Sequence, residues 1–144
     1  MDTQKYVIRQ ISIFSENRPG RLAAIAHALG EEKINILAFS IAEANGFGVV
    51  RALVDHPEKA HAKLSTLGFN IAFTEVIAVR MKDQPGGLYE VAKILGDSGI
   101  NIEYSYAYSG KEGAVLILRV DQVDEAIKKI IGSGATLLER SKFH

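Results

Sequence analysis

The sequence predicts an α+β protein made of two copies of a strand–helix–strand–strand–helix–strand unit, with antiparallel sheets and the helices on one face. Two observations lead to this prediction. Shifted by 66 residues, the chain matches itself without a gap, and 16 of 62 aligned pairs between residues 11–72 and 77–138 are identical. Within each copy, segments with alternating apolar residues are interleaved with segments of helical apolar spacing.

The identities gather at positions that punctuate structure. Pro19-Gly20 falls on Pro85-Gly86, and Ile34-Asn35-Ile36 falls on Ile100-Asn101-Ile102. Two copies are too few for a solenoid, so they indicate paired domains. We expect one repeat over residues 1–70 and the other over 71–144.

The first strand and first helix of each copy follow from local pattern. Tyr6–Phe14 alternates and is rich in Val and Ile, which favours a strand. Pro19-Gly20 then opens a helix, because proline is tolerated in the first turn. The expected apolar stripes of these helices are Leu22, Ile25, Ala26 and Leu29 in copy one and Leu88, Val91, Ala92 and Leu95 in copy two.

A hairpin and a second helix follow in each copy. Strands are expected at Ile34–Ala42 and Phe47–Asp55 around the turn Asn45-Gly46, and at Ile100–Tyr108 and Ala114–Asp121. Asp55-x-x-Glu58 and Asp121-x-x-Asp124 resemble capping boxes that begin second helices. The core positions expected on these helices are Ala60, Leu64 and Leu67, and Val123, Ala126, Ile127, Ile130 and Ile131, with Gly68 and Gly134 ending them.

The joint between the copies is one run, Phe69–Met81, without Pro or Gly. By the 66-residue offset it matches both the first strand of copy one and the end of copy two, Thr136–Lys142. We therefore expect residues 69–81 to serve as the last strand of the first repeat and the first strand of the second. The halves would then be stiffly coupled.

Both faces of the predicted sheets are largely apolar. Helices can cover one face, and another sheet or subunit the other, so we expect at least a dimer. Tyr104, Tyr106 and Tyr108 share one strand face. Such a face can stack RNA bases. The zero net charge and the absence of a basic-aromatic string favour packing against a helix or a second subunit instead.

The turn before the first helix is the best candidate for a binding site in each copy. A helix N-terminus presents free N–H groups and a partial positive charge, which suit a carboxylate. Asn17 adds an amide, whereas Asp83 accepts only and suits an ammonium group. A structural alternative is that both residues simply help to begin the helices. The candidate residues are Asn17, Arg18, Pro19, Gly20, Arg21 and Leu22 in copy one, and Asp83, Gln84, Pro85, Gly86, Gly87 and Leu88 in copy two.

Asn35 and Asn101 are further candidates. Each lies between two isoleucines at a strand start, where asparagine is unfavourable. They are interpreted either as edge or turn contacts, or as polar groups reaching toward the same helix-start pocket.

Each copy has the same series of features: a strand, then Asn or Asp followed by x-Pro-Gly-x-Leu at the start of a helix, then Gly and Ile-Asn-Ile. This series resembles the ACT domain. The resemblance occurs twice and covers nearly the whole chain. The resemblance implies ferredoxin-like βαββαβ sandwiches that pair and often bind amino acids between domains. It implies effector contacts at Asn17 and Asn35 in copy one and at Asn101 in copy two. Asp83 departs from the asparagine found in serine-regulated phosphoglycerate dehydrogenases, so the two halves need not bind equally.

The resemblance implies a stand-alone tandem ACT protein that senses an amino acid or similar small zwitterion and can regulate a separate metabolic enzyme. The alternatives are a ligand-free structural or partner-binding dimerisation module, and a small enzyme on a ferredoxin-like scaffold. The last is disfavoured because no acid–base constellation converges. We expect a homodimer that is not an enzyme and has no catalytic residues.

Composition excludes other classes. With 144 residues, 17 basic and 17 acidic side chains and no Cys, the chain offers no disulfide framework, thiol nucleophile or Cys-based metal site. The zero net charge gives no global attraction to nucleic acid or membranes. No apolar run approaches a membrane span and no signal peptide begins the chain, so a cytoplasmic protein is expected, without cofactor or metal.

Overall fold

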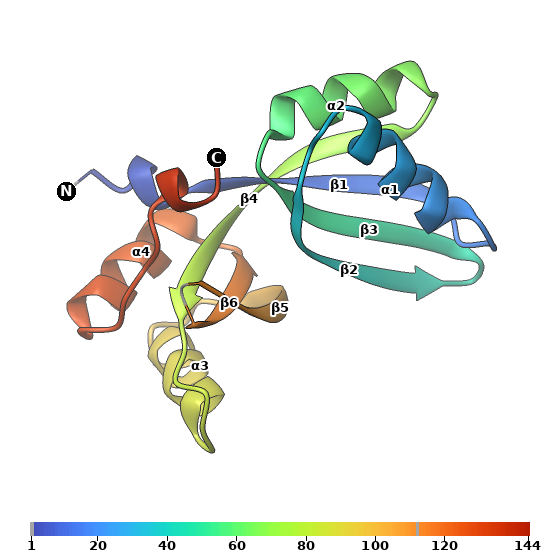
Figure 1. Ribbon diagram of the computed structural model, residues 1–144. Helices are drawn as coiled ribbons and strands as arrows, with labels where there is room; N and C mark the ends of the chain where they lie inside the picture. The colour runs from blue at the N-terminus through green and yellow to red at the C-terminus, as the bar shows by residue number, and fades with distance from the viewer. Residues whose placement is uncertain (1, 112) are drawn as a thin grey trace. The chain divides into compact units, whose positions relative to one another are not determined.

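The computed structural model describes residues 2–111 and 113–144, and its chain separates into two compact units (Figure 1). The repeat-one unit comprises Arg9–Thr74 with Phe143–His144. The repeat-two unit comprises the residues up to Ile8 with Glu75–Lys142. Each unit is described by itself below.

The repeat-one unit is a four-stranded antiparallel sheet with two helices on one face (Figure 1). Its strands lie in the order β2-β3-β1-β4, and β1 and β2 both pair antiparallel with β3. The Ser12 and Thr74 hydroxyls, 3.1 Å apart, link β1 to the first part of β4. The elements are β1 (Ile8–Glu16), α1 (Arg21–Glu31), β2 (Ile36–Ala44), β3 (Phe47–Val54), α2 (Pro57–Thr66) and β4 (Asn70–Arg80).

Strand alternation decides which residues reach the helices. Ile11 and Ile13 on β1 lie opposite Ala52 and Val50 on β3, and all four are buried in one cluster. The helices add Ile25, Ala28, Leu29, Ala60 and Leu64 to this cluster. Residues that alternate with them, such as Phe14 and Val49, therefore face the side of the sheet that carries no helix.

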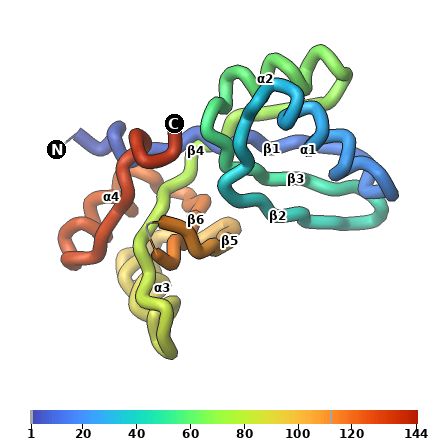
Figure 2. Tube along the Cα trace, viewed as in Figure 1, coloured from blue at the N-terminus to red at the C-terminus, as the bar shows by residue number. Residues whose placement is uncertain are grey.

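The repeat-two unit has the same succession of elements after β4, which can be followed along the chain trace in Figure 2. Its strands lie in the order β4-β6-β5, and Leu137 forms a single bridge to Val79 on the other side of β4. Helices α3 and α4 supply Val91, Leu95, Ala126, Ile127 and Ile130 to its core. The further elements are α3 (Gly87–Asp97), β5 (Ile102–Gly110), β6 (Gly113–Val120) and α4 (Val123–Gly132). The prediction of two ferredoxin-like repeats is confirmed.

The N-terminal segment and the segment around Arg140 are tied into the repeat-two unit. The Thr3 hydroxyl donates to Asp124 at 2.7 Å, and Arg140 Nε donates to the Val7 carbonyl at 2.7 Å. Short 3-10 helices at Gln4–Tyr6 and Arg140–Lys142 accompany these contacts. The first of these helices replaces the predicted start of a strand at Tyr6. The last strand, predicted at Thr136–Lys142, is reduced to the single bridge at Leu137.

The apolar stripes differ in detail from the predicted ones. On α1 the buried residues are Ile25, Ala28 and Leu29, whereas Ala26 is exposed. Leu22, Leu67 and Leu88 are also exposed. All three leucines lie at helix ends, and a periodic pattern does not show where along a helix burial stops.

The three tyrosines do not face helices of their own unit. Tyr104, Tyr106 and Tyr108 lie opposite Arg119, Ile117 and Val115 on β6. The residues of β6 that join the helix-covered core are instead Leu116, Leu118 and Val120. The tyrosines thus occupy the helix-free face, so the predicted packing against a helix is wrong within this unit.

Among residues 2–111 and 113–144, no helix is long and apolar enough to cross a membrane. The same residues include no cluster of three His, Asp or Glu side chains that could hold a metal ion.

Candidate functional site

The two helix-starting turns share one backbone conformation. Gly20 and Gly86 occupy the N-cap positions of α1 and α3 with φ of 90° and 89°, a left-handed conformation that favours glycine. Their carbonyls accept from Ala24 N at 2.9 Å and Glu90 N at 3.1 Å. Because the N-cap residue is glycine, no N-cap side chain covers the first helical N–H groups. Asn17 and Asp83 are therefore not the N-cap residues of these helices.

The turn of repeat one borders a small hollow between α1 and the edge of the sheet. Asn17 N donates to the Gly46 carbonyl at 2.8 Å, which ties the turn to the β2–β3 hairpin. The Asn17 side chain lies so close to Gly48 that a Cβ there would be 3.2 Å from Asn17 Cβ. The hollow measures about 20 Å³ and is lined by Ser15, Glu16, Asn17, Arg21, Leu22, Ile25, Ile41, Gly48 and Val50.

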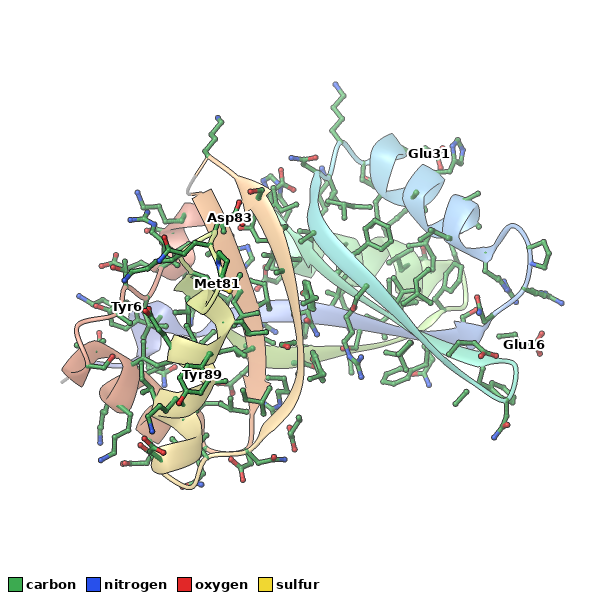
Figure 3. The ribbon with its side chains drawn as sticks, turned by 90° about the horizontal axis from the view of Figure 1, so that it is seen from below. Tyr6, Glu16, Glu31, Met81, Asp83 and Tyr89 are labelled. Atoms are coloured by element: carbon green, nitrogen blue, oxygen red, sulfur yellow. The ribbon has the colours of Figure 1, made fainter. Side chains whose placement is uncertain are left out.

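Arg21 places a cation at this hollow. Its Nε is buried and has no hydrogen-bond partner, while its guanidinium carbon lies 5.8 Å from the centroid of the Phe69 ring. A buried donor without a partner costs free energy, and a carboxylate is the acceptor that matches a guanidinium best. Figure 3 shows Glu16 at this end of the unit and Glu31 at the far end of α1. The Glu16 carboxylate lies 3.5 Å from Arg18 and is exposed.

The turn of repeat two is built differently. Asp83, Gln84, Pro85 and Gly86 are exposed, but Gly87, which corresponds to Arg21, is buried. A Cβ at Gly87 would lie 2.0 Å from the Lys82 carbonyl oxygen, so only glycine fits there. The two turns share their glycine N-cap, but repeat two lacks the cation of repeat one.

Asn35 does not join Asn17 within the repeat-one unit. Glu16, next to Asn17, lies opposite Phe47 at the start of β3. Asn35 lies just beyond the other end of β3, where its N–H donates to Asp55 Oδ1 and its carbonyl accepts from the Asp55 N–H. The eight residues of β3 separate the two positions by about 25 Å. The same arrangement recurs at Asn101, whose N–H donates to Asp121 Oδ1 at 3.0 Å.

The same contacts show what the side chains of Asp55 and Asp121 do. Asp55 and Asp121 accept from the strand-start N–H groups, and the N-caps of α2 and α4 are His56 and Gln122, without side-chain capping bonds. The predicted capping boxes are therefore wrong. Partial burial alone would raise the pKa of Asp55, but hydrogen bonds from the His56 ring and from Asn35 N–H outweigh it and lower that pKa below its ordinary value.

A larger hollow lies on the helix-free face of the repeat-one sheet, at the same end. It measures about 600 Å³ and is lined by Phe14, Ser15, Glu16, Ala42, Glu43, Ala44, Phe47, Gly48, Val49 and Asn70. Phe47 is 67% exposed and Phe14 43% exposed. The sequence pattern missed this hollow and the contributions of Ile41 and Gly48. The register set by the Asn45-Gly46 turn, which places Gly48 opposite Ser15, was the signal that could have found them.

Comparison with known proteins connects this geometry to a family. A model of the ACT domain pair matches residues 6–142, which is nearly the whole chain. The chain belongs to the ACT domain pair family. ACT domains are regulatory, so the family that the chain matches is a regulatory domain pair. No curated protein matches its sequence.

Solved structures share the fold of this ACT pair. Protein BT0572 from Bacteroides thetaiotaomicron is 33% identical, with a TM-score of 0.90 and 96% of each chain covered. The ligand-free regulatory subunit of aspartate kinase from Thermus thermophilus is 17% identical, with a TM-score of 0.64, covering 86% of this chain and 91% of that one. A structure of aspartokinase α and β subunits is 18% identical, with a TM-score of 0.58, covering 88% and 95%.

Proposed function

We propose that this ACT pair senses a free amino acid in the cytoplasm at the turn of repeat one and thereby regulates a separate metabolic enzyme. The observation that carries the proposal is Arg21, whose buried Nε lacks an acceptor beside an uncapped helix N-terminus. Both features favour a bound carboxylate. The Asn17 amide and the Glu16 carboxylate at the same turn are suited to bind the ligand's ammonium group.

Repeat two is the weaker candidate for the same ligand. Gly87 replaces Arg21, and Asp83 brings an acceptor where repeat one has an amide. A carboxylate at this turn would meet an acidic side chain without the compensating guanidinium. We therefore assign the amino acid to repeat one and leave Asp83, Gln84, Pro85, Gly86, Leu88 and Asn101 as weaker positions.

Replacing Asn17 with alanine tests this assignment. Isothermal titration with each of the twenty amino acids should identify a ligand for the wild type, and the variant should bind it about tenfold more weakly because one hydrogen-bonding group is lost. Asp83→Ala at the matching position of repeat two is the control and should bind normally. Equal loss in both variants, or no binding by the wild type at millimolar concentration, would contradict the assignment.

We also propose that the protein is a homodimer formed through β2. This strand is at the edge of the repeat-one sheet, and an edge strand offers unpaired backbone groups to another chain. On its helix-covered side it carries Phe39, 50% exposed, and Ile41, 43% exposed. Ile41 lines the repeat-one hollow together with the exposed Leu22 of α1. The matching positions on β5 are Ser105 and Ala107, so this side of β5 lacks the large apolar side chains that β2 carries.

Antiparallel pairing of two β2 strands would also bring Asn35 of one subunit close to Asn17 of the other, although the two residues are far apart within one subunit. Such pairing sets the start of one strand opposite the end of the other. The partner's Asn35 would then lie near the Asn17 turn. The repeat-one hollow of about 20 Å³ holds only about one water, so an amino acid there needs a further wall.

The double substitution Phe39→Ser with Ile41→Ala tests the dimer. It gives β2 the residues that β5 of repeat two has at the matching positions. Because it removes the apolar edge and leaves the core intact, the variant should be a monomer at concentrations where the wild type is a dimer. Analytical ultracentrifugation over a dilution series would measure this. Leu88→Ala, which trims an exposed leucine of repeat two, should remain dimeric. An unchanged dissociation constant in the double variant would reject β2 as the interface.

A ligand-free partner-binding module is the second candidate function. It is favoured by the helix-free hollow of about 600 Å³, whose apolar residues include the exposed Phe14 and Phe47. An exposed apolar patch of this kind is typical of protein interfaces. If no amino acid binds in the titrations above, this reading takes precedence over the sensor.

A further inference from the structure

The two repeats differ in how they fill the space between the first helix and the segment after the second helix. In repeat one, Phe69 packs against the buried core and Arg21 lies above its ring, 5.8 Å from the centroid. The 66-residue offset replaces Phe69 with Ala135 and Arg21 with Gly87. Repeat two thus lacks both large side chains that occupy this space in repeat one.

A groove of about 760 Å³ lies at that place in repeat two. Both Gly87 and Ala135 line it, which identifies it with the filled space of repeat one. Its size is within the range of small-molecule sites. Figure 3 shows Met81 and Asp83 near the end of β4 and Tyr89 on the neighbouring α3. The lining residues are Arg80, Met81, Lys82, Gly87, Tyr89, Glu90, Val91, Lys93, Ile94, Asp97, Ser133, Gly134, Ala135 and Thr136.

The interior of this groove is apolar. Met81, Ile94 and Ala135 are half-buried against the repeat-two core, with the buried Val91 beneath them. Tyr89 is 65% exposed and supplies an aromatic wall. Thioether and aromatic groups make favourable contacts with a ring. The groove therefore suits a planar apolar group, as the equivalent space in repeat one suits Phe69.

The rim of the groove carries charges of both signs. Lys82 lies 3.6 Å from Glu90, and Lys93 lies 2.9 Å from Asp97. All four side chains are more than half exposed, so each pair contributes little to stability and can exchange its partner at small cost. A ligand with a carboxylate and an ammonium group could pair with one lysine and one neighbouring acid at once.

We propose that the groove between α3 and residues 133–136 binds a free aromatic amino acid. The ring enters the space that Phe69 occupies in repeat one and contacts Tyr89, Met81 and Ile94. The zwitterionic group remains at the rim with the lysine–acid pairs. This site is distinct from the repeat-one turn and does not depend on the function proposed for that turn.

Replacing Ala135 with phenylalanine restores the side chain of repeat one and tests the proposal. Titration calorimetry with phenylalanine, tyrosine and tryptophan, and with leucine as a non-aromatic comparison, should show binding of the aromatic ligands to the wild type. Ala135→Phe should weaken that binding by about tenfold or more, because the ring of the new side chain occupies the groove. Ala135→Ser keeps the space open and should bind as the wild type does.

Tyr89→Ala is a second test that leaves the core untouched, and it should also weaken aromatic binding. Urea unfolding of each variant shows whether the fold is retained. The proposal is overturned if no aromatic amino acid binds at millimolar concentration, or if both Ala135→Phe and Tyr89→Ala bind normally. If Asn17→Ala alone abolishes aromatic binding, the ligand lies at the repeat-one turn. The groove proposal then fails while the proposed sensor stands.

Discussion

Replacing Gly87 with alanine should destabilise the protein by roughly 3 kcal/mol, the upper end of what overpacking costs. The added Cβ would lie 2.0 Å from the Lys82 carbonyl oxygen and 3.0 Å from its carbonyl carbon. Both atoms belong to the backbone, so no side-chain rotation can relieve the contact. The turn before α3 would have to open, with loss of the Gly87 N to Gln84 carbonyl hydrogen bond. Urea unfolding monitored by circular dichroism would measure the loss.

Gly96→Ala is the matched control in the same helix. A Cβ at Gly96 meets nothing within 4 Å, and alanine favours a helix over glycine by roughly 0.5–1 kcal/mol. The same substitution should therefore stabilise the protein at one end of α3 and destabilise it at the other. If Gly87→Ala unfolds at the wild-type midpoint, the close approach at Lys82 is not a feature of the molecule in solution.

The repeat and its element order could be predicted because they depend on local pattern. The alternation of Ile11 and Ile13, the Asn45-Gly46 turn and the glycine after each second helix all act within a few residues. Strand boundaries shifted by about two residues, as at β1 and β2, because side-chain periodicity does not define where pairing begins. The Leu137 bridge replaces a whole predicted strand because Arg140 turns the chain toward Val7 and Gln4, a contact across more than a hundred residues.

The candidate site was predictable only in part. The turns at Pro19-Gly20 and Pro85-Gly86 were found, because their glycines impose a local conformation. The position of Asn35 could not be predicted. The two ends of a strand are far apart, and the sequence pattern does not show which end lies near the turn. The difference between Arg21 and Gly87 was visible in the sequence. Its meaning required the distance to the Lys82 carbonyl and the groove beside Ala135.

We expect residues 69–81 to be shared between the repeats. A substitution in the core of one repeat tests this when its effect on unfolding is measured in the other repeat. β4 is continuous over Asn70–Arg80; its first part packs against the repeat-one core and its last part, with Ile77 and Val79, belongs to the repeat-two core. We propose that this strand couples the unfolding of the two units. All five tyrosines lie in the repeat-two unit and the chain has no Trp, so tyrosine fluorescence reports on that unit alone.

Leu29→Ala should therefore lower the urea midpoint seen by tyrosine fluorescence, although Leu29 lies in the repeat-one core. Leu29 and Leu95 are matching, fully buried residues, and each truncation should cost about 3 kcal/mol. With coupling through β4, both variants should show one transition, with fluorescence and circular dichroism coincident. Without coupling, Leu29→Ala would leave the tyrosine transition at the wild-type midpoint and split the circular dichroism curve, whereas Leu95→Ala would shift the tyrosine signal in either case. The behaviour of Leu29→Ala thus decides whether one strand serves both repeats as a mechanical link.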